Sequence, residues 1–148
     1  MGRTFDDFPV GARFETAERE ITEGEIVAFA RDWDPQEFHT DPEAAGRGPF
    51  GGLSASGFHT LLVAFRLTID TGAWVGASLG SPGMEEIRWL LPVRPGDRLK
   101  VAATVAAARV SRSKPDRGIV TFEHAVTRQD GETVMTYRSH VFLKRRGA

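Results

Sequence analysis

A carboxylate and an imidazole stand five residues apart in the first third of the chain, at Asp34 and His39. Residues five apart on one helix point about 140° away from each other, so the two side chains could not converge there. Pro35 follows the carboxylate directly, ends any helix that arrives from the N-terminal side and biases Asp34 away from helical angles. Both side chains can therefore hang from one irregular loop and meet at one water molecule, where an Asp–His pair can move protons.

The same residues also fit a purely structural role. Asp-Pro commonly opens a turn, and Asp41-Pro42 predicts the N-cap and first-turn proline of a short helix over Pro42 to Gly46. The Asp-x4-His spacing is a weak signal. On spacing alone, catalysis and turn formation both stay open.

The composition is that of an ordinary globular protein. The chain has 148 residues, 41% hydrophobic and 26% charged, which predicts one domain over residues 1–148 with a proper core. Its 19 basic and 20 acidic residues nearly cancel, so charge gives no case for binding nucleic acid or a membrane surface. Cysteine is absent, which excludes disulfides, a thiolate nucleophile and cysteine-ligated metals.

The first ten residues contain no apolar run, so we expect neither a signal peptide nor a membrane anchor. No stretch approaches the length needed to cross a bilayer. We therefore expect a cytoplasmic protein.

The first half of the chain predicts a strand and then a helix that leads into the Asp–His pair. Residues 12–21 alternate loosely, as in a short strand. Thr22 and Glu25 have the spacing of a capping box, and the helix that they open should end near Trp33, before Pro35. Asp34 is then expected directly after a helix C-terminus.

A glycine-rich stretch, residues 46–57, leads into the longest predicted helix, Ser56 to about Gly72. Apolar residues occur on nearly all of its sides, which predicts a helix buried on all sides. Ser56 is a plausible N-cap and leaves the N–H groups of Gly57 and Phe58 as free donors at the positive end of the helix dipole. His59, on the same helix, is expected to be structural.

Strand patterns follow over residues 84–93, 98–110, 119–126 and 133–143, with a hairpin turn at Asp130-Gly131. Leu99, Val101 and Val105 alternate onto one face of the second of these. One antiparallel sheet wrapped around the long helix satisfies this order best, which is an α+β fold. Because such a sheet leaves a free edge, pairing with a second copy is expected.

Three motifs in this order resemble the MaoC-like dehydratases, close to the (R)-specific enoyl-CoA hydratases, which adopt the hot-dog fold. Residues 34–39, Asp-Pro-Gln-Glu-Phe-His, resemble the hydratase motif Asp, any residue, Asn, Pro, an aliphatic and His. Residues 50–57, Phe-Gly-Gly-Leu-Ser-Ala-Ser-Gly, look like the lead into the central helix. Residues 86–97, Glu-Ile-Arg-Trp-Leu-Leu-Pro-Val-Arg-Pro-Gly-Asp, are similar to the strand and turn after it. The resemblance covers nearly the whole chain.

The resemblance implies roles for individual residues. Asp34 and His39 match the catalytic pair, and Gly57 matches the glycine whose amide binds the oxyanion. Three neighbours are expected to contact substrate: Gln36, Ser56 and Phe58. The motif's Asn is Gln36 here, its Pro is Glu37, and the usual His before the helix glycine is Ser56. Gln36 can still donate and accept hydrogen bonds, whereas Glu37 brings a charge near the pair, so these departures bear on the substrate more than on the fold.

The implied activity is that of an (R)-specific enoyl-CoA hydratase or acyl dehydratase, a hydro-lyase that adds water reversibly to a 2-enoyl thioester. Alternatives are an acyl-CoA thioesterase of the same fold and a non-catalytic acyl-CoA-binding subunit. The expected partners are an acyl-CoA substrate and a second copy of the chain in a homodimer or a higher assembly. No cofactor is expected, and a metal at His39 and Asp41 lacks an apparent third ligand. Basic residues between 94 and 117 are expected to meet the CoA phosphates. The sequence does not define acyl-chain length or CoA versus acyl-carrier-protein thioesters.

Overall fold

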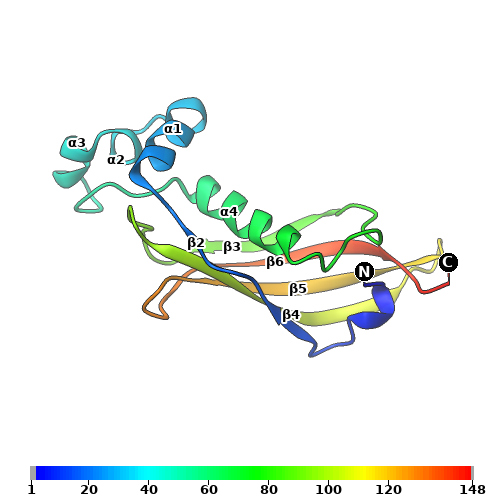
Figure 1. Cartoon of the computed structure of the whole chain (residues 1–148). Coiled ribbons are helices and arrows are strands. Elements are labelled where there is room, and N and C mark those ends of the chain that lie inside the picture. The colour runs from blue at the N-terminus through cyan, green and yellow to red at the C-terminus, as the bar shows by residue number, and fades with distance from the viewer. Residues whose placement is uncertain (1–2, 148) are drawn as a thin grey trace.

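An antiparallel sheet cups one long helix, α4, in the computed structural model, which describes residues 3–147 (Figure 1). The sheet order is β1-β4-β5-β6-β3, and β2 also pairs with β4. This confirms the α+β architecture expected from the sequence. The elements are η1 (Phe5–Asp7), β1 (Arg13–Glu15), β2 (Arg19–Glu20), α1 (Glu23–Trp33), α2 (Glu37–Thr40), α3 (Pro42–Gly46), α4 (Gly57–Asp70), β3 (Gly83–Trp89), β4 (Arg98–Val110), β5 (Arg117–Thr127) and β6 (Thr133–Lys144).

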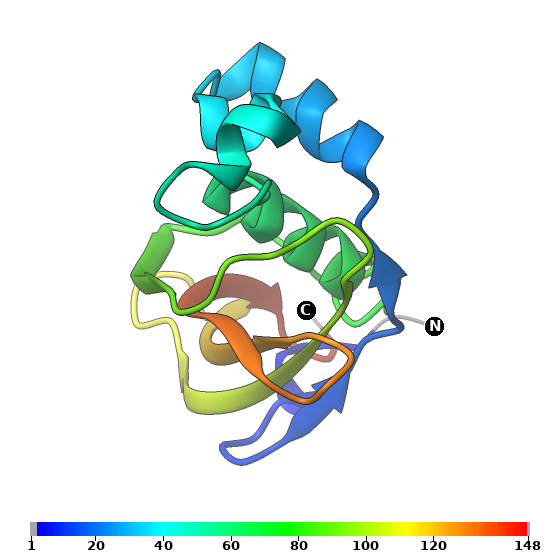
Figure 2. The same cartoon turned by 90° about the vertical axis from the view of Figure 1, so that its left-hand side faces the viewer.

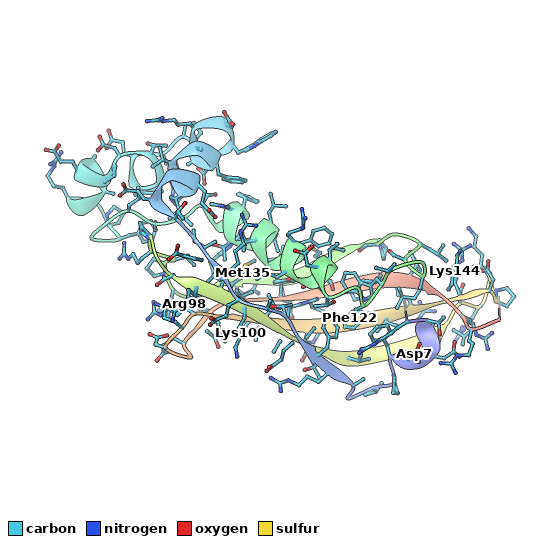
Figure 3. The ribbon with its side chains drawn as sticks, viewed as in Figure 1. Asp7, Arg98, Lys100, Phe122, Met135 and Lys144 are labelled. Atoms are coloured by element: carbon cyan, nitrogen blue, oxygen red, sulfur yellow. The ribbon has the colours of Figure 1, made fainter. Side chains whose placement is uncertain are left out.

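The three long strands follow the alternation of their side chains. Leu99, Val101 and Val105 of β4 are all buried on the face toward α4, as the period of two predicts. Met135 of β6 and Phe122 of β5 lie on the same face (Figure 3). The strands are joined by antiparallel pairing throughout. They form the floor on which the helix rests.

The first predicted strand is divided into two short ones, β1 and β2, which both pair with β4. Between them the hydroxyl of Thr16 accepts a hydrogen bond from the Val101 N–H at 2.9 Å, in place of a backbone carbonyl. The chain then leaves the ladder at Ala17 and Glu18. The predicted strand after the helix is also shorter than expected, since β3 ends at Trp89, before Pro92, which has no N–H to donate.

Helix α4 corrects the expectation of a helix buried on all sides. Its buried side, which includes Val63, Ala64 and Leu67, packs on the sheet. The opposite side of α4 is uncovered beyond α1–α3 (Figure 1), and Figure 2 shows α4 between the sheet and these three helices. An apolar stripe occupies this open side, formed by Phe58, Leu62, Phe65 and Ile69. The apolar residues of α4 therefore divide between one side that packs on the sheet and one side that is exposed in the single chain.

Helices α1, α2 and α3 gather at the N-terminal end of α4 (Figure 1). Thr22 caps α1, as predicted, by accepting a hydrogen bond from the Glu25 N–H at 3.2 Å. Asp41 caps α3 by accepting from the Glu43 N–H at 3.0 Å, followed by the expected proline in the first turn. Local capping signals thus fix where these helices begin.

The other end of the sheet is closed by aromatic rings. Phe122 makes edge contacts with Phe8 and Phe14, with ring centroids 5.4 and 6.0 Å apart, and Trp74 lies 5.5 Å from it. No helix within residues 3–147 has the length and apolar character needed to cross a membrane.

Candidate active site

Asp34 lies directly after α1, as expected. Its N–H donates to the Ala30 carbonyl at 2.8 Å, and its backbone then leaves helical angles with φ −152° and ψ 66°. Pro35 follows, and the Gln36 N–H donates back to the Asp34 carbonyl at 2.8 Å. This tight turn reverses the chain within two residues, so that the next side chains return toward Asp34.

His39 lies in the one-turn helix α2, which corrects the expectation that it belongs to an irregular loop. Because α1 and α2 are separate helices with a turn between them, the divergence of residues five apart on one helix does not apply. The Nε2 of His39 lies 3.4 Å from Oδ2 of Asp34. The two side chains therefore meet, and Pro35 makes this possible.

A backbone carbonyl fixes the tautomer of His39. Its Nδ1 lies 2.6 Å from the carbonyl oxygen of Ser54. A carbonyl only accepts hydrogen bonds, so Nδ1 must carry the proton and donate it. In the neutral ring Nε2 is then the free acceptor, and it is the nitrogen that faces Asp34.

Asp34 is held as a carboxylate by two neighbours. Burial raises its pKa, but hydrogen bonds from Gln36 and Ser56 and the proximity of His39 lower it by more, so its pKa lies below the ordinary value of 3.8. The Ser56 hydroxyl donates to Oδ2 at 2.7 Å, and the Gln36 amide donates to Oδ1. Asp34 is thus ionised at neutral pH.

The N-terminal end of α4 lies beside this pair. Ser56 occupies the N-cap position, as expected, but its side chain makes no cap hydrogen bond because it is turned to Asp34. The first intrahelical bond runs from the Thr60 N–H to the Ser56 carbonyl at 3.1 Å. The N–H groups of Gly57 and Phe58 precede it at the positive end of the helix, where an N–H has no intrahelical acceptor.

A cavity of about 270 Å³ opens onto these groups. Of the six residues predicted for the site, Asp34, His39, Gly57 and Phe58 line it. Ser56 is fully buried behind Asp34, and Gln36 is exposed beside it. The remaining walls are mainly apolar and include Phe50, Trp89, Leu90, Leu91, Val93 and Val134.

Trp89 is a wall residue that lies within the third motif but received no role from the sequence. Its indole N–H donates to the Gly57 carbonyl at 2.9 Å, and its ring meets Phe58 edge-on with centroids 5.7 Å apart. A Cβ added at Gly57 would lie 2.4 Å from the indole, which is too close for any side chain. Position 57 therefore needs glycine for packing, independently of any role of its N–H.

A β-bulge aims Trp89 at this place. Glu85 pairs with Arg138 on the outer face of the sheet, whereas Trp89 pairs with Met135 on the face toward α4. Four residues apart in a regular strand, both would face the same side. The register shift between Glu85 and Arg88 adds one residue to β3, so Trp89 faces the side opposite to Glu85. Within this bulge Glu86 has a positive φ of 52°. Nothing in the local sequence marks it, because glutamate has no preference for positive φ.

His59 stays outside the cavity, consistent with the structural role expected for it. It is buried, stacks on Phe29 with centroids 4.6 Å apart, and its Nε2 lies 3.9 Å from Glu25. Its Nδ1 has no hydrogen-bond partner. Burial lowers the pKa of His59, which the nearby Glu25 opposes. His59 thus joins α4 to α1.

Residues 7–127 match the family described as MaoC like domain. The uncharacterized protein YdeM of Bacillus subtilis is 31% identical over 140 residues, which cover 95% of this chain and 98% of that protein. The 3-hydroxyacyl-thioester dehydratase Z of Mycobacterium tuberculosis is 36% identical over 87 residues, 57% of this chain and 58% of that protein.

Among solved structures, that of the MaoC-like dehydratase from Rhodospirillum rubrum superposes on this one with a TM-score of 0.92. The two sequences are 40% identical, and the match covers 99% of this chain and 100% of the other. The agreement over the full length confirms the hot-dog fold.

Proposed function

This protein belongs to the MaoC-like domain family, and from that premise we propose that it is a hydro-lyase that adds water reversibly to a 2-enoyl thioester. The observation that carries the proposal is the pair Asp34 and His39, which meets in a cavity also lined by Gly57. The dehydratase Z relative and the R. rubrum dehydratase support the same reaction class. A chain that only bound acyl groups would not need the pair.

The pair is suited to hold and deprotonate one water molecule. The 3.4 Å between Nε2 of His39 and Oδ2 of Asp34 is longer than a good N–H···O hydrogen bond, so the two atoms are better placed to share a third group than to bond each other. The free lone pair of Nε2 accepts the proton of that water. The carboxylate of Asp34 then faces the imidazolium that forms. Such acid–base assistance typically contributes about 10²–10⁴-fold to the rate.

The hydration step balances within the cavity. The water oxygen bonds to C3 of the enoyl group, while the C2–C3 double bond becomes a single bond and the proton taken by the pair is delivered to C2. Negative charge develops on the thioester oxygen, and we propose that the Gly57 N–H donates to it. One such donor is worth roughly 3–4 kcal/mol, and the dipole of α4 adds to it. The reverse sequence dehydrates a 3-hydroxyacyl thioester.

We propose an acyl-CoA as substrate, with its phosphates at the site end of β4. The basic residues expected to meet them divide between the two ends of the sheet. Arg98 and Lys100 lie at the end that carries α1–α3 (Figure 3). Arg109, Arg112 and Arg117 lie toward the opposite end, at the β4–β5 connection (Figure 1). Within one chain, the first group lies nearer the cavity and is the one that we propose meets the phosphates. Raising the salt concentration should then raise KM and leave kcat unchanged.

We further propose a homodimer that covers the open side of α4. Phe58, Leu62, Phe65 and Ile69 form an apolar stripe beside the edge strand β3, which has a free side. Such exposed apolar surface next to an unpaired edge favours association with a second copy. Light scattering should give twice the monomer mass for the wild type and the monomer mass for Leu62→Lys. Arg66→Gln, a nearby polar change, should leave the dimer intact, and a monomeric wild type would refute this part of the proposal.

The activity is tested with crotonyl-CoA and longer 2-enoyl-CoAs. Hydration removes the conjugated double bond, so the absorbance of the conjugated thioester should fall without release of free thiol. Release of thiol at the same rate would show a thioesterase instead. Binding without either change would show a non-catalytic acyl-CoA-binding subunit.

A further inference from the structure

Arg94 lies in the loop after β3 and points at the backbone of the glycine-rich stretch. One of its terminal nitrogens, Nη1, donates to the carbonyls of Gly52 at 2.8 Å and Leu53 at 3.3 Å. The other, Nη2, donates to the carbonyl of Phe50. The planar guanidinium thus clamps three carbonyls at once, which the single ammonium of a lysine cannot match in geometry.

The backbone of Arg94 is itself anchored. Its N–H donates to the carboxylate of Asp97 at 2.8 Å, and the other oxygen of Asp97 accepts from the Gln129 amide at 2.9 Å. Asp97 is buried at the turn before β4. The guanidinium therefore projects from a fixed point of the sheet toward a stretch that has little regular structure.

The residues that Arg94 clamps continue directly into the two that hold the Asp–His pair. The Ser54 carbonyl accepts from Nδ1 of His39 at 2.6 Å, and the Ser56 hydroxyl donates to Asp34 at 2.7 Å. Between them the Ala55 N–H donates at 2.8 Å to the carbonyl of Val93, which directly precedes Arg94 in the β3–β4 connection. Residues 54–56 thus orient both Asp34 and His39. Arg94 holds the residues directly before this segment, 50–53.

The clamped stretch has little rigidity of its own. Gly48, Gly51 and Gly52 give its backbone more conformational freedom than other residues would. At Gly52 a Cβ would lie 3.2 Å from Nη1 of Arg94, so this glycine also makes room for the guanidinium. Without the clamp, residues 50–53 lose their three side-chain hydrogen bonds to the sheet.

We propose that Arg94 is a positioning residue for the Asp34–His39 pair, acting through the carbonyls of residues 50–53. This inference rests on the proposed hydration activity. Arg94 does not line the cavity, and three of its five guanidinium donors are directed at backbone carbonyls, which favours a positioning role over phosphate binding. A displacement of a catalytic group by about 1 Å can cost as much as about 10²-fold in rate.

The test compares Arg94→Met and Arg94→Lys with the wild type in steady-state hydration of crotonyl-CoA. Both variants should lower kcat by about 10–10²-fold and change KM by less than roughly threefold, because positioning acts on the reaction step and not on substrate affinity. Guanidinium at roughly 20 mM, far below denaturing concentrations, should restore part of the kcat of Arg94→Met, whereas sodium at the same concentration should not. Arg47→Met is the matched control, since Arg47 precedes the clamped residues 50–53 but is exposed and pairs loosely with Glu43 at 3.6 Å. It should keep the wild-type kcat.

A second measurement does not depend on activity. The Nδ1 proton of His39, bonded to the Ser54 carbonyl, should give a protected downfield resonance in proton NMR that is missing in His39→Ala. In Arg94→Met this proton should exchange with water faster than in the wild type, and in Arg47→Met it should not. An inactive wild type would refute the proposed function, while the NMR comparison would still decide the role of Arg94.

Three results would overturn the inference. They are a wild-type kcat in Arg94→Met, a loss confined to KM that high salt reproduces in the wild type, and a loss of the folded circular dichroism spectrum. The first would show that the clamp is dispensable. The second would make Arg94 a phosphate ligand, and the third would make it a residue needed for folding.

Discussion

Two of the buried histidines of this molecule, His39 and His124, lie in contrasting surroundings. His39 lies at the N-terminal end of α4, with Nδ1 bonded to a backbone carbonyl and Nε2 facing an open cavity. His124 lies in β5 on the face toward α4, stacked on Tyr137 with centroids 4.3 Å apart. Its Nε2 meets the Ser139 hydroxyl at 2.7 Å, and its Nδ1 has no partner.

The difference shows that burial alone does not make a histidine a proton carrier. Both rings are less than a tenth exposed. Only His39 has a carboxylate beside it and a nitrogen aimed at a space that a substrate can enter. Burial lowers the pKa of His124 from its ordinary value of 6.5 to about 4, which keeps that ring neutral at physiological pH.

The largest effect on kcat is expected from changes to the proposed catalytic pair, Asp34 and His39. Asp34→Asn keeps the shape but removes the charge, and His39→Ala removes the proton carrier. If both groups act on one water molecule, as proposed, each change should lower kcat by about 10²-fold or more and barely change KM. Steady-state hydration of crotonyl-CoA measures this.

The double variant should be little worse than the worse single one, since groups that act as a unit are not additive. Thermal unfolding should change only slightly, because both side chains border a cavity. If His39→Ala unfolds the protein or hydrates crotonyl-CoA normally, His39 is structural and the contrast with His124 disappears.

The second prediction concerns the stability that His124 contributes. Its lowered pKa means that the folded protein binds fewer protons than the unfolded chain between pH about 4 and 6.5. The free energy of unfolding is therefore not reduced by His124 above pH 6.5, and it falls as the pH decreases from 6.5 toward 4 because the unfolded chain binds the proton first. Over that window the free energy of unfolding should fall by about 3 kcal/mol from this group alone. Urea unfolding at pH 7.0 and 4.5 measures it.

His124→Phe keeps the ring against Tyr137 but cannot titrate, so its stability should depend less on pH than that of the wild type. Its kcat at pH 7.5 should stay within about threefold of wild type, because the ring lies outside the cavity walls around His39. An unchanged pH dependence in His124→Phe would contradict the assignment.

The smallest effect is expected at the bulge of β3, which aims Trp89 at the His39 cavity. Glu86 has φ 52°, a left-handed conformation that costs a non-glycine residue about 1 kcal/mol. Glu86→Gly relieves this at some cost in chain entropy, so the melting temperature should rise by roughly 1–3 °C. Glu86→Ala removes the same carboxylate but keeps the Cβ and serves as the control, with no rise. A lower melting temperature for Glu86→Gly than for Glu86→Ala would refute strain at this bulge.

Much of the fold could be read from local signals in the sequence. The caps at Thr22 and Asp41 and the alternation of β4 are short-range patterns, and the structure follows them. Asp34 and His39 are predicted as a catalytic pair through motif order, because their spacing alone is ambiguous. The structure then showed that Pro35 separates two helices and so lets the side chains meet.

Other features left no readable signal because they depend on tertiary contacts. Ser54 orients His39 through its backbone carbonyl. Because every residue has a carbonyl, no side-chain type in the sequence indicates this contact. Ser56 looked like a helix cap, yet its hydroxyl is used by Asp34. The open stripe of α4 was missed because apolar residues that face a core and those that face a partner look alike in sequence. Arg94 belongs to the basic residues that the sequence predicts to meet the CoA phosphates, and its hydrogen bonds to backbone carbonyls leave no mark in the sequence.

The bulge in β3 also has a consequence for comparing related sequences. Between Glu85 and Trp89, the number of residues decides which face of the sheet each side chain points to. Loss or gain of one residue there would turn Trp89 to the outer face, whereas a change of two would keep it over Gly57. Relatives that keep an aromatic ring over this glycine should therefore differ in length within β3 by even numbers of residues. An alignment gap of a single residue at this place would mark a relative whose cavity is walled differently.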